Sequence, residues 1–309
     1  MPQNRFIFLL LSVLIYFFYC STSLAQNSCW SEVKNAVIEK DKQRDLLYRR
    51  ITHLSPGIND RQGSLFLEGH DPAHALVLIH GYPSYPRHFS GLAKILNEKY
   101  GYTIYAPLLS GLGGPAKVGN KVKLEDWRKD VDDALTLARH CANKVSLVGH
   151  SMGGGVAIDT IFNPINSQID SLILISPMIK TQSSLSRVLA TIASTLGIKT
   201  FGVISTNLVK QVFRVIDNIQ EYWDHLPRNN IPTFLSVTMD DKILDPFASL
   251  SFPSSKLNIV DQLIFPQNSG VGHNEIITPK NIYLDELAER LDLFLKKFFK
   301  GSDPVTGGF

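Results

Sequence analysis

Short apolar segments recur along the chain, separated by longer segments in which apolar and polar residues are mixed. The residues from Ala75 to Ile79 are all apolar, and runs without polar alternation are typical of strands that are buried on both faces of a parallel sheet. Similar short segments indicate further strands at 64–68, 102–106, 145–148, 172–175, 233–237 and within 257–265.

The segments between these strands have the apolar spacing of amphipathic helices. From Phe89 to Glu98, apolar residues recur at intervals of three and four positions, which places them on one helical face. Helices are predicted at 30–50, at 89–98, at 124–138, directly after residue 151 and at 282–299. Strands that alternate with helices in this way predict an α/β fold with an open, mostly parallel, doubly wound sheet.

Residues 177–230 interrupt this alternation. They contain no convincing strand, and their apolar residues fall on helical faces at 188–196 and 208–216. We expect a helical cap, inserted after the strand at 172–175, that lies over the carboxyl ends of the strands, where such sheets bind ligands. The apolar side chains of the cap either line a ligand pocket or pack the cap against the main domain.

The first residues have the composition of an export signal. Arg5 supplies a positive charge, Phe6 to Tyr19 is almost entirely apolar, and Ser23-Leu24-Ala25 places small residues where a signal peptidase cuts. The sequence therefore predicts a signal peptide at residues 1–25, a mature domain at 26–309 and a periplasmic or secreted location. The apolar run is shorter than the roughly 20 residues that span a bilayer, and an uncleaved N-terminal membrane anchor is the alternative.

Two cysteines, Cys29 and Cys141, follow the predicted signal peptide. An oxidising compartment permits them to form a disulfide. The alternative is that they are two unrelated thiols, one of them buried.

Composition and charge narrow the class of function. The chain of 309 residues has a net charge of +3 and no arginine-rich arm, so nothing indicates a nucleic-acid partner. No cluster of side chains has the spacing of a metal site, and the glycine-rich segment 111–114 lacks the spacing of a dinucleotide-binding fingerprint. We therefore expect neither a metal ion nor an organic cofactor.

The segment from Gly149 to Gly153 has the pattern G-x-S-x-G, with Ser151 at its centre. It follows the strand at 145–148 and begins a segment of small residues, which is the strand–turn–helix context of a nucleophile elbow. A turn this tight needs small residues two positions before and two positions after the serine, and both positions are glycine. A glycine-rich turn with a solvated serine would fit this pattern alone, so other motifs have to decide between the two interpretations.

Further motifs occur in the order found in one enzyme superfamily. Between about Ala75 and Phe298 the chain resembles the α/β-hydrolases, in particular bacterial carboxylesterases and monoacylglycerol lipases. The matching segments are His80-Gly81-Tyr82-Pro83, Pro107-Leu108-Leu109-Ser110-Gly111-Leu112-Gly113, Gly149–Gly153, Asp241-Lys242-Ile243-Leu244-Asp245-Pro246 and Gly272-His273. The second segment departs from the usual P-x-x-x-G-H-G, because Leu112 stands where that pattern has histidine.

The resemblance implies a Ser–His–Asp catalytic triad. Ser151 would attack an acyl carbonyl, His273 would accept the serine proton, and Asp241 would orient the imidazole and stabilise the imidazolium. The chain order Ser, Asp, His is the order that this fold uses. The backbone N–H groups of Tyr82 and Met152 would form the oxyanion hole.

Neighbouring carboxylates compete with Asp241 for the role of the triad acid. Asp240, Asp241 and Asp245 all follow the strand at 233–237. Asp245 precedes a proline and has the position of a helix cap. Asp240 is therefore the main alternative, and the resemblance favours Asp241.

The choice among the nine histidines follows from their positions. Only His273 comes after the last predicted strand, in a glycine-rich loop before the final helix. His80 precedes the predicted oxyanion turn, where we expect structural hydrogen bonds. His150 lies inside the elbow and is expected to point away from Ser151.

The leading hypothesis is an exported serine hydrolase that cleaves carboxylic esters of lipids or of short to medium acyl chains through an acyl-enzyme. An amide or peptide hydrolase of the proline-type aminopeptidase class would use the same triad, with Asp217, Glu221 and Asp224 at helical spacing to bind a substrate amine. A catalytically inert α/β-hydrolase scaffold used for binding is the third hypothesis. The expected partner is a small-molecule or lipid ester, which would include peripheral contact with a membrane. The sequence predicts no oligomeric state.

Overall fold

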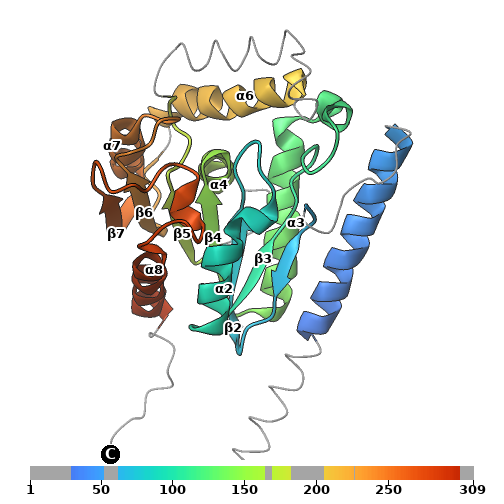
Figure 1. The fold of residues 1–309 in the computed structure, drawn as a ribbon, viewed down its shortest axis with the longest axis horizontal. Coiled ribbons are helices and arrows are strands. Elements are labelled where there is room, and N and C mark those ends of the chain that lie inside the picture. The colour runs from blue at the N-terminus through green and yellow to red at the C-terminus, as the bar shows by residue number, and fades with distance from the viewer. Residues whose placement is uncertain (1–28, 52–61, 164–168, 182–204, 226, 300–309) are drawn as a thin grey trace, which may run out of the picture.

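Seven strands form one sheet, in the order β1-β3-β2-β4-β5-β6-β7, in the computed structural model of the chain (Figure 1). β1 (Leu65–Leu67) pairs with β3 in the antiparallel direction, and all other neighbouring strands are parallel. The structure describes residues 29–51, 62–163, 169–181, 205–225 and 227–299. The predicted α/β fold with an open, mostly parallel sheet is confirmed.

The remaining strands coincide with the apolar segments of the sequence. They are β2 (Asp71–Ile79), β3 (Tyr102–Ala106), β4 (Lys144–His150), β5 (Ser171–Ile175), β6 (Pro232–Thr238) and β7 (Asn258–Phe265). β3 and β5 are buried along their whole length, whereas β7 forms the edge of the sheet and is partly exposed. β2 begins at Asp71 rather than at Ala75, because Asp71 pairs with Tyr102 ahead of an irregularity in the register.

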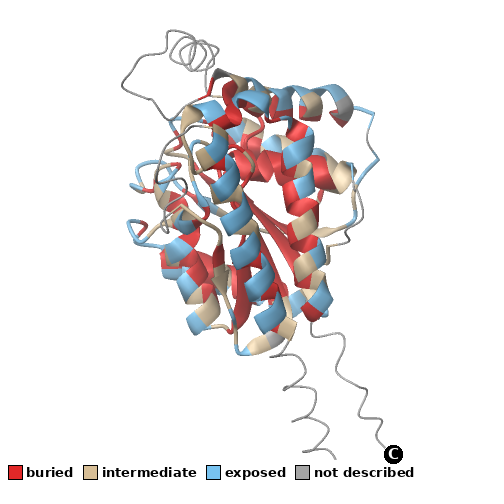
Figure 2. Cartoon of the chain, turned by 90° about the vertical axis from the view of Figure 1, so that its right-hand side faces the viewer, coloured by how far each residue is buried: buried red, intermediate tan, exposed pale blue. Residues whose placement is uncertain are grey.

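Helices cover both faces of the sheet. α2 (Ser90–Glu98) and α8 (Leu284–Phe299) lie on one face, and α3 (Leu124–Cys141) and α4 (Met152–Phe162) lie on the other. Alternate residues of β2 divide between the two layers: Val77 and Ile79 belong to the core with α3 and α4, and Leu76 and Leu78 to the core with α2 and α8. The strands are accordingly buried in Figure 2, and the helices are exposed on their outer sides.

Four further described elements connect these layers, and one of them begins after a predicted N-cap residue. They are η1 (Pro86–Phe89), η2 (Ala116–Lys121), α7 (Pro246–Lys256) and η4 (Glu275–Ile277). The Asp245 carboxylate accepts hydrogen bonds from the N–H groups of Phe247 and Ala248, both at 3.1 Å. Asp245 therefore caps α7, as its position before proline predicted.

The N-terminal helix, described over residues 29–51, packs beside α3 (Figure 1). Trp30, Val33 and Val37 are buried in the same core as α3. A disulfide joins Cys29 to Cys141 at the end of α3, with 5.7 Å between the two Cα atoms. Of the two alternatives for these cysteines, the structure therefore contains the disulfide.

Two polar side chains of this helix hold the loop that follows β3. The Arg44 guanidinium donates to the Leu108 carbonyl and, at 2.8 Å, to the Asp130 carboxylate. The Tyr48 hydroxyl accepts from the Gly111 N–H at 3.0 Å and donates to the Leu112 carbonyl at 3.1 Å. The loop that departs from the family pattern at Leu112 thus finds hydrogen-bond partners on a helix 64 residues earlier in the chain.

α6 (Thr206–Trp223) is the helix of the predicted cap that the structure describes, and it lies above α4 in Figure 1. Its buried residues, among them Leu208 and Val215, belong to the same core as α4. A Cβ on Gly155 of α4 would lie 2.8 Å from the Val215 side chain, so the two helices approach closely. The apolar residues of α6 therefore pack the cap against the main domain, which is the second of the two predicted alternatives.

Several expectations concern residues outside the described part of the chain. The signal peptide at 1–25 and the cap helix at 188–196 lie there, and the cap boundaries 177–230 stay a prediction. Within the described residues, no helix has both the length and the apolar character to cross a membrane.

Candidate active site

Ser151 lies in a sharp turn between β4 and α4. Its backbone has φ 56° and ψ −125°, a conformation that residues with a side chain rarely adopt. The Ser151 N–H donates to the Ile175 carbonyl at 3.1 Å, and the Ser151 carbonyl accepts from the Met178 N–H at 2.8 Å. These contacts to the end of β5 and the segment after it hold the strained turn in place.

The glycines that flank the turn leave no space for a side chain. A Cβ on Gly149 would lie 2.5 Å from the Gly153 carbonyl oxygen, and a Cβ on Gly153 would lie 2.0 Å from the Ile79 carbonyl oxygen. The end of β2 and the first turn of α4 are thus in direct backbone contact. The prediction that the turn requires small residues at both positions is confirmed.

The structure brings Ser151, His273 and Asp241 together. The His273 Nε2 atom lies 2.8 Å from the Ser151 hydroxyl oxygen, and its Nδ1 atom lies 2.6 Å from an Asp241 carboxylate oxygen. Exposed fractions are 6% for Ser151, 5% for His273 and 3% for Asp241, so water reaches these groups little. A hydroxyl, an imidazole and a carboxylate in this sequence of hydrogen bonds can pass a proton from the serine to the imidazole.

Asp241 is held by its own turn after β6. Its second carboxylate oxygen accepts from the N–H groups of Ile243 and Leu244, both at 2.8 Å. The carboxylate therefore has its orientation fixed before it meets the imidazole. Neutral backbone donors on one oxygen leave the other oxygen to His273.

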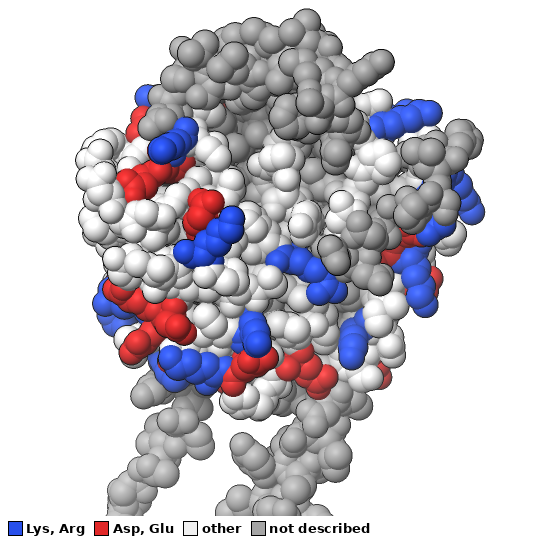
Figure 3. All heavy atoms as spheres, in the orientation of Figure 1, with Lys and Arg blue, Asp and Glu red and all other residues white. Residues whose placement is uncertain are grey.

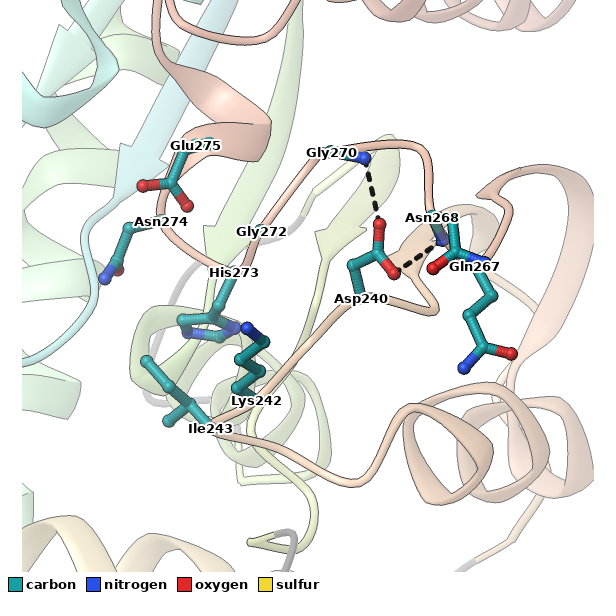
Figure 4. Close-up of a pocket in the computed structure, with 10 residues that line it drawn as sticks. All are labelled: Asp240, Lys242, Ile243, Gln267, Asn268, Gly270, Gly272, His273, Asn274 and Glu275. Carbon is teal, nitrogen blue, oxygen red and sulfur yellow. Dashed lines mark hydrogen bonds between the residues drawn. The ribbon is translucent and has the colours of Figure 1, made fainter.

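Asp240 points away from His273 and binds a different segment. It accepts from the N–H groups of Asn268 at 2.8 Å and Gly270 at 3.0 Å, as Figure 4 shows. The hydrogen bond from Asn268 is the main reason that the pKa of Asp240 lies below its ordinary value. The geometry thus gives the two neighbouring aspartates separate tasks: Asp240 holds the loop after β7, and Asp241 contacts the imidazole.

The backbone segments that carry the predicted oxyanion donors adjoin Ser151. Met152 is the first residue of α4, where backbone N–H groups have no carbonyl partner within the helix. On the other side, a Cβ on Gly81 would lie 2.8 Å from the Ser151 Cβ, so the backbone that leads into Tyr82 packs against the serine.

His80 connects the backbone at Gly81 to the loop that follows β3. Its Nε2 atom accepts from the Leu109 N–H at 3.2 Å, and its Nδ1 atom lies 3.0 Å from the Gly81 carbonyl. Complete burial lowers the pKa of His80 to about 4, so the ring is neutral at pH 7. The predicted structural hydrogen bonds of His80 are confirmed.

A polar hollow of about 720 Å³ borders His273, between the loops that follow β6 and β7 (Figure 4). Lys242 and Glu275 bring opposite charges to its walls, and Ser151 is not among its lining residues. Across the described residues, no group of histidine, cysteine or carboxylate side chains is arranged to hold a metal ion.

Sequence reasoning missed the contact that His150 makes. The His150 Nε2 atom lies 3.0 Å from the backbone carbonyl oxygen of His273, which is 123 residues later in the chain. The elbow and the loop that bears His273 are thus connected by a second hydrogen bond besides the one to Ser151. No signal in the local sequence indicates this contact, because it depends on the path of a distant loop.

The sequence matches a family described as serine aminopeptidase, S33, over residues 70–203. It is 29% identical over 119 residues to the phospholipase YtpA of Bacillus subtilis, and the aligned segment covers 38% of this chain and 46% of that protein. It is also 29% identical over 143 residues to the monoacylglycerol lipase of Mycolicibacterium smegmatis, and the aligned segment covers 45% of this chain and 50% of that protein. The chain therefore spans about half the length of these two curated relatives.

The fold matches that of a soluble variant of monoglyceride lipase from Saccharomyces cerevisiae, solved with a substrate analogue. The TM-score is 0.63, and the match covers 79% of this chain and 97% of the yeast protein. Only 15% of the aligned residues are identical, so this likeness establishes the fold alone.

Proposed function

The chain belongs to the α/β-hydrolase superfamily, and on that basis we propose that it is a serine hydrolase of the esterase and lipase type, which cleaves carboxylic esters. The observation that carries the proposal is the continuous hydrogen-bonded series from the Ser151 hydroxyl through His273 to Asp241, at 2.8 and 2.6 Å. The strained backbone at the serine supports it, because strained backbone conformations cluster at active sites.

In the proposed mechanism, Ser151 attacks the ester carbonyl while the His273 Nε2 atom takes the hydroxyl proton. The backbone N–H groups of Met152 and Tyr82 stabilise the oxyanion of the tetrahedral intermediate, and each such donor contributes about 3 kcal/mol in the transition state. His273 then gives the proton to the leaving alcohol, and Asp241 stabilises the imidazolium between these two steps. Water, deprotonated by His273, releases the acid from the acyl-enzyme.

We assign the substrate to the lipid esters and the short or medium acyl esters. The support comes from the two curated relatives, a phospholipase and a monoacylglycerol lipase. Acidic and basic side chains are interspersed over the face seen in Figure 3, which suits an uncharged ester better than a polyanion. A lipid substrate would bring the protein into peripheral contact with a membrane.

Amide hydrolysis is the second candidate, because the matching family is described as a serine aminopeptidase. That activity needs an anionic group beside the scissile bond to bind the substrate amine. Asp217, Glu221 and Asp224 are all exposed along α6 and its end, whereas the buried side of α6 is apolar. Their position on the outer side of the helix argues against these three residues as the group that would bind the substrate amine.

We further propose that the protein is exported after cleavage near residue 25. The disulfide between Cys29 and Cys141 supports this location, because disulfides persist mainly in oxidising compartments. N-terminal sequencing of protein recovered from the periplasm or the medium tests it. A start at Met1 in membrane-bound protein would instead indicate the uncleaved anchor.

The activity is tested with p-nitrophenyl esters from acetate to palmitate and with aminoacyl p-nitroanilides, on the wild type and on Ser151→Ala. We expect ester turnover in the wild type only, with little release of p-nitroaniline. Fluorophosphonate labelling of Ser151, read by mass spectrometry, reports the reactive serine without any choice of substrate. Folded wild-type protein that is not labelled would contradict the proposal and favour the inert scaffold.

A further inference from the structure

His150 occupies a position that links the two halves of the proposed triad. It is the last residue of β4, directly before Ser151, and the residue is 1% exposed. The centre of the ring lies 5.1 Å from that of His273, with the two planes 35° apart. His88 and Phe89 enclose the other sides with edge contacts at 6.0 and 6.2 Å.

The polar atoms of this ring have unequal surroundings. A carbonyl oxygen only accepts hydrogen bonds, so the Nε2 atom, 3.0 Å from the His273 carbonyl, carries the proton. Burial lowers the pKa of His150 well below its ordinary value, and the ring is therefore neutral with a bare Nδ1 atom. That Nδ1 atom is buried and has no hydrogen-bond partner within the described structure.

A buried ring nitrogen without a partner destabilises a fold, and a hydrocarbon side chain of similar shape would avoid that cost. Packing alone therefore does not account for a histidine at this position. The hydrogen bond of the Nε2 atom does account for the histidine, because no apolar side chain can donate a hydrogen bond to the His273 carbonyl.

His273 depends on such contacts, since its loop belongs to no strand. The Thr238 hydroxyl donates to the Val271 carbonyl, and the Asp240 carboxylate accepts from the Gly270 N–H at 3.0 Å. Both of these contacts reach the loop from the end of β6, ahead of His273. Of these three contacts, only the one from His150 is made to the backbone of the residue that bears the imidazole, and it comes from the elbow.

We propose that His150 is a positioning residue, whose hydrogen bond to the His273 carbonyl keeps the His273 imidazole within reach of the Ser151 hydroxyl. The proposal rests on the proposed function of the triad for its effect on turnover. His150 has no contact with the substrate in this role, so its loss lowers kcat and leaves KM unchanged.

A matched pair of variants separates the hydrogen bond from packing. In His150→Gln the side-chain amide nitrogen lies as many bonds from Cβ as the histidine Nε2 atom does, and it can donate to the same carbonyl. In His150→Met the side chain has the same length and no donor. We expect His150→Gln to keep kcat within about threefold of wild type, and His150→Met to lose about 10- to 100-fold at constant KM, as small misplacements of a reacting group do.

A second measurement does not need ester hydrolysis. The proton between the His273 Nδ1 atom and Asp241 is held at 2.6 Å and should give a low-field NMR resonance. We expect this resonance in the wild type and in His150→Gln, and its broadening or loss in His150→Met. If the wild type hydrolyses no ester while the NMR pattern holds, the proposed function fails and the positioning role stands.

The inference is overturned if both variants have the same kcat and the same low-field resonance, because the donor then makes no difference. Urea denaturation of each variant establishes that it is folded. Should His150→Met fail to fold, His150→Asn takes its place, since its amide is polar and too short to reach the His273 carbonyl. Equal behaviour of His150→Asn and His150→Gln would refute the inference in the same way.

Discussion

Replacement of both Cys29 and Cys141 by serine should lower the free energy of unfolding by several kcal/mol and leave kcat close to wild type. The disulfide connects two residues that are 112 positions apart. Cross-linking over a loop of this length removes chain entropy from the unfolded state that corresponds to about 5 kcal/mol at 25 °C, and measured effects are more often about 2–4 kcal/mol. We therefore expect a loss of about 2–5 kcal/mol.

The native state should survive this change with its N-terminal helix in place. Trp30, Val33 and Val37 remain buried, and Arg44 remains paired with Asp130 at 2.8 Å. The cross-link therefore acts on the unfolded chain more than on the docking of the helix. Turnover should not change, because neither cysteine contacts the residues of the proposed triad.

Urea denaturation of the oxidised wild type, the reduced wild type and the double variant measures the effect. The midpoint should fall equally in the last two. Their slopes should be equal to each other and no lower than that of the oxidised wild type, since an unfolded chain without the cross-link is less compact and the slope follows the surface exposed on unfolding. A smaller slope would mean that the helix had already detached from the folded protein. A midpoint of the double variant equal to that of the oxidised wild type would refute the reasoning.

The other predictions concern the site and its support. Asp241→Asn should lower kcat by about 10⁴-fold, as loss of the orienting carboxylate does in other triads, whereas Asp240→Asn should lower kcat far less. Steady-state ester kinetics of the two variants measure this difference. A larger loss of kcat in Asp240→Asn than in Asp241→Asn would exchange the roles of the two aspartates. Gly153→Ala should yield little soluble enzyme or none that reacts with a fluorophosphonate, because its Cβ would meet a β2 carbonyl oxygen at 2.0 Å; normal labelling would contradict this. The pKa of His80 is about 4 in the fold and near 6.5 when unfolded, so the unfolded chain binds the additional proton and stability falls as the pH drops between these values. This group alone should cost about 2 kcal/mol at pH 5 relative to pH 7, measured by urea midpoints, and His80→Gln should lack that part of the pH dependence.

The meeting of the three triad residues follows from features that a sequence displays. Ser151, Asp241 and His273 each follow a predicted strand, and the carboxyl ends of parallel strands lie along one edge of the sheet. The apolar runs predicted the strands, and the Gly149–Gly153 pattern predicted the nucleophile elbow. Asp241 could be preferred over Asp240 only through the family resemblance, because adjacent residues in a turn have no periodicity that sets their directions.

Other features depend on distances that local patterns do not contain. Whether Cys29 and Cys141 pair is decided by a Cα separation of 5.7 Å, which arises from the packing of the N-terminal helix on α3. The start of β2 at Asp71 depends on its neighbour Tyr102 and not on its own polar sequence. The bond from His150 to His273 requires the path of a loop that is fixed by Asp240 and Thr238.

The hydrogen bonds from Arg44 and Tyr48 to the loop after β3 constrain how this protein can be recombined with its relatives. The carbonyls of Leu108 and Leu112 satisfy their hydrogen bonds on a helix that begins far upstream. A chimera that received this loop without the helix would lose both hydrogen bonds, each of which contributes about 1 kcal/mol to stability. Helix and loop therefore form one transplantable module, although 64 residues separate their contact points.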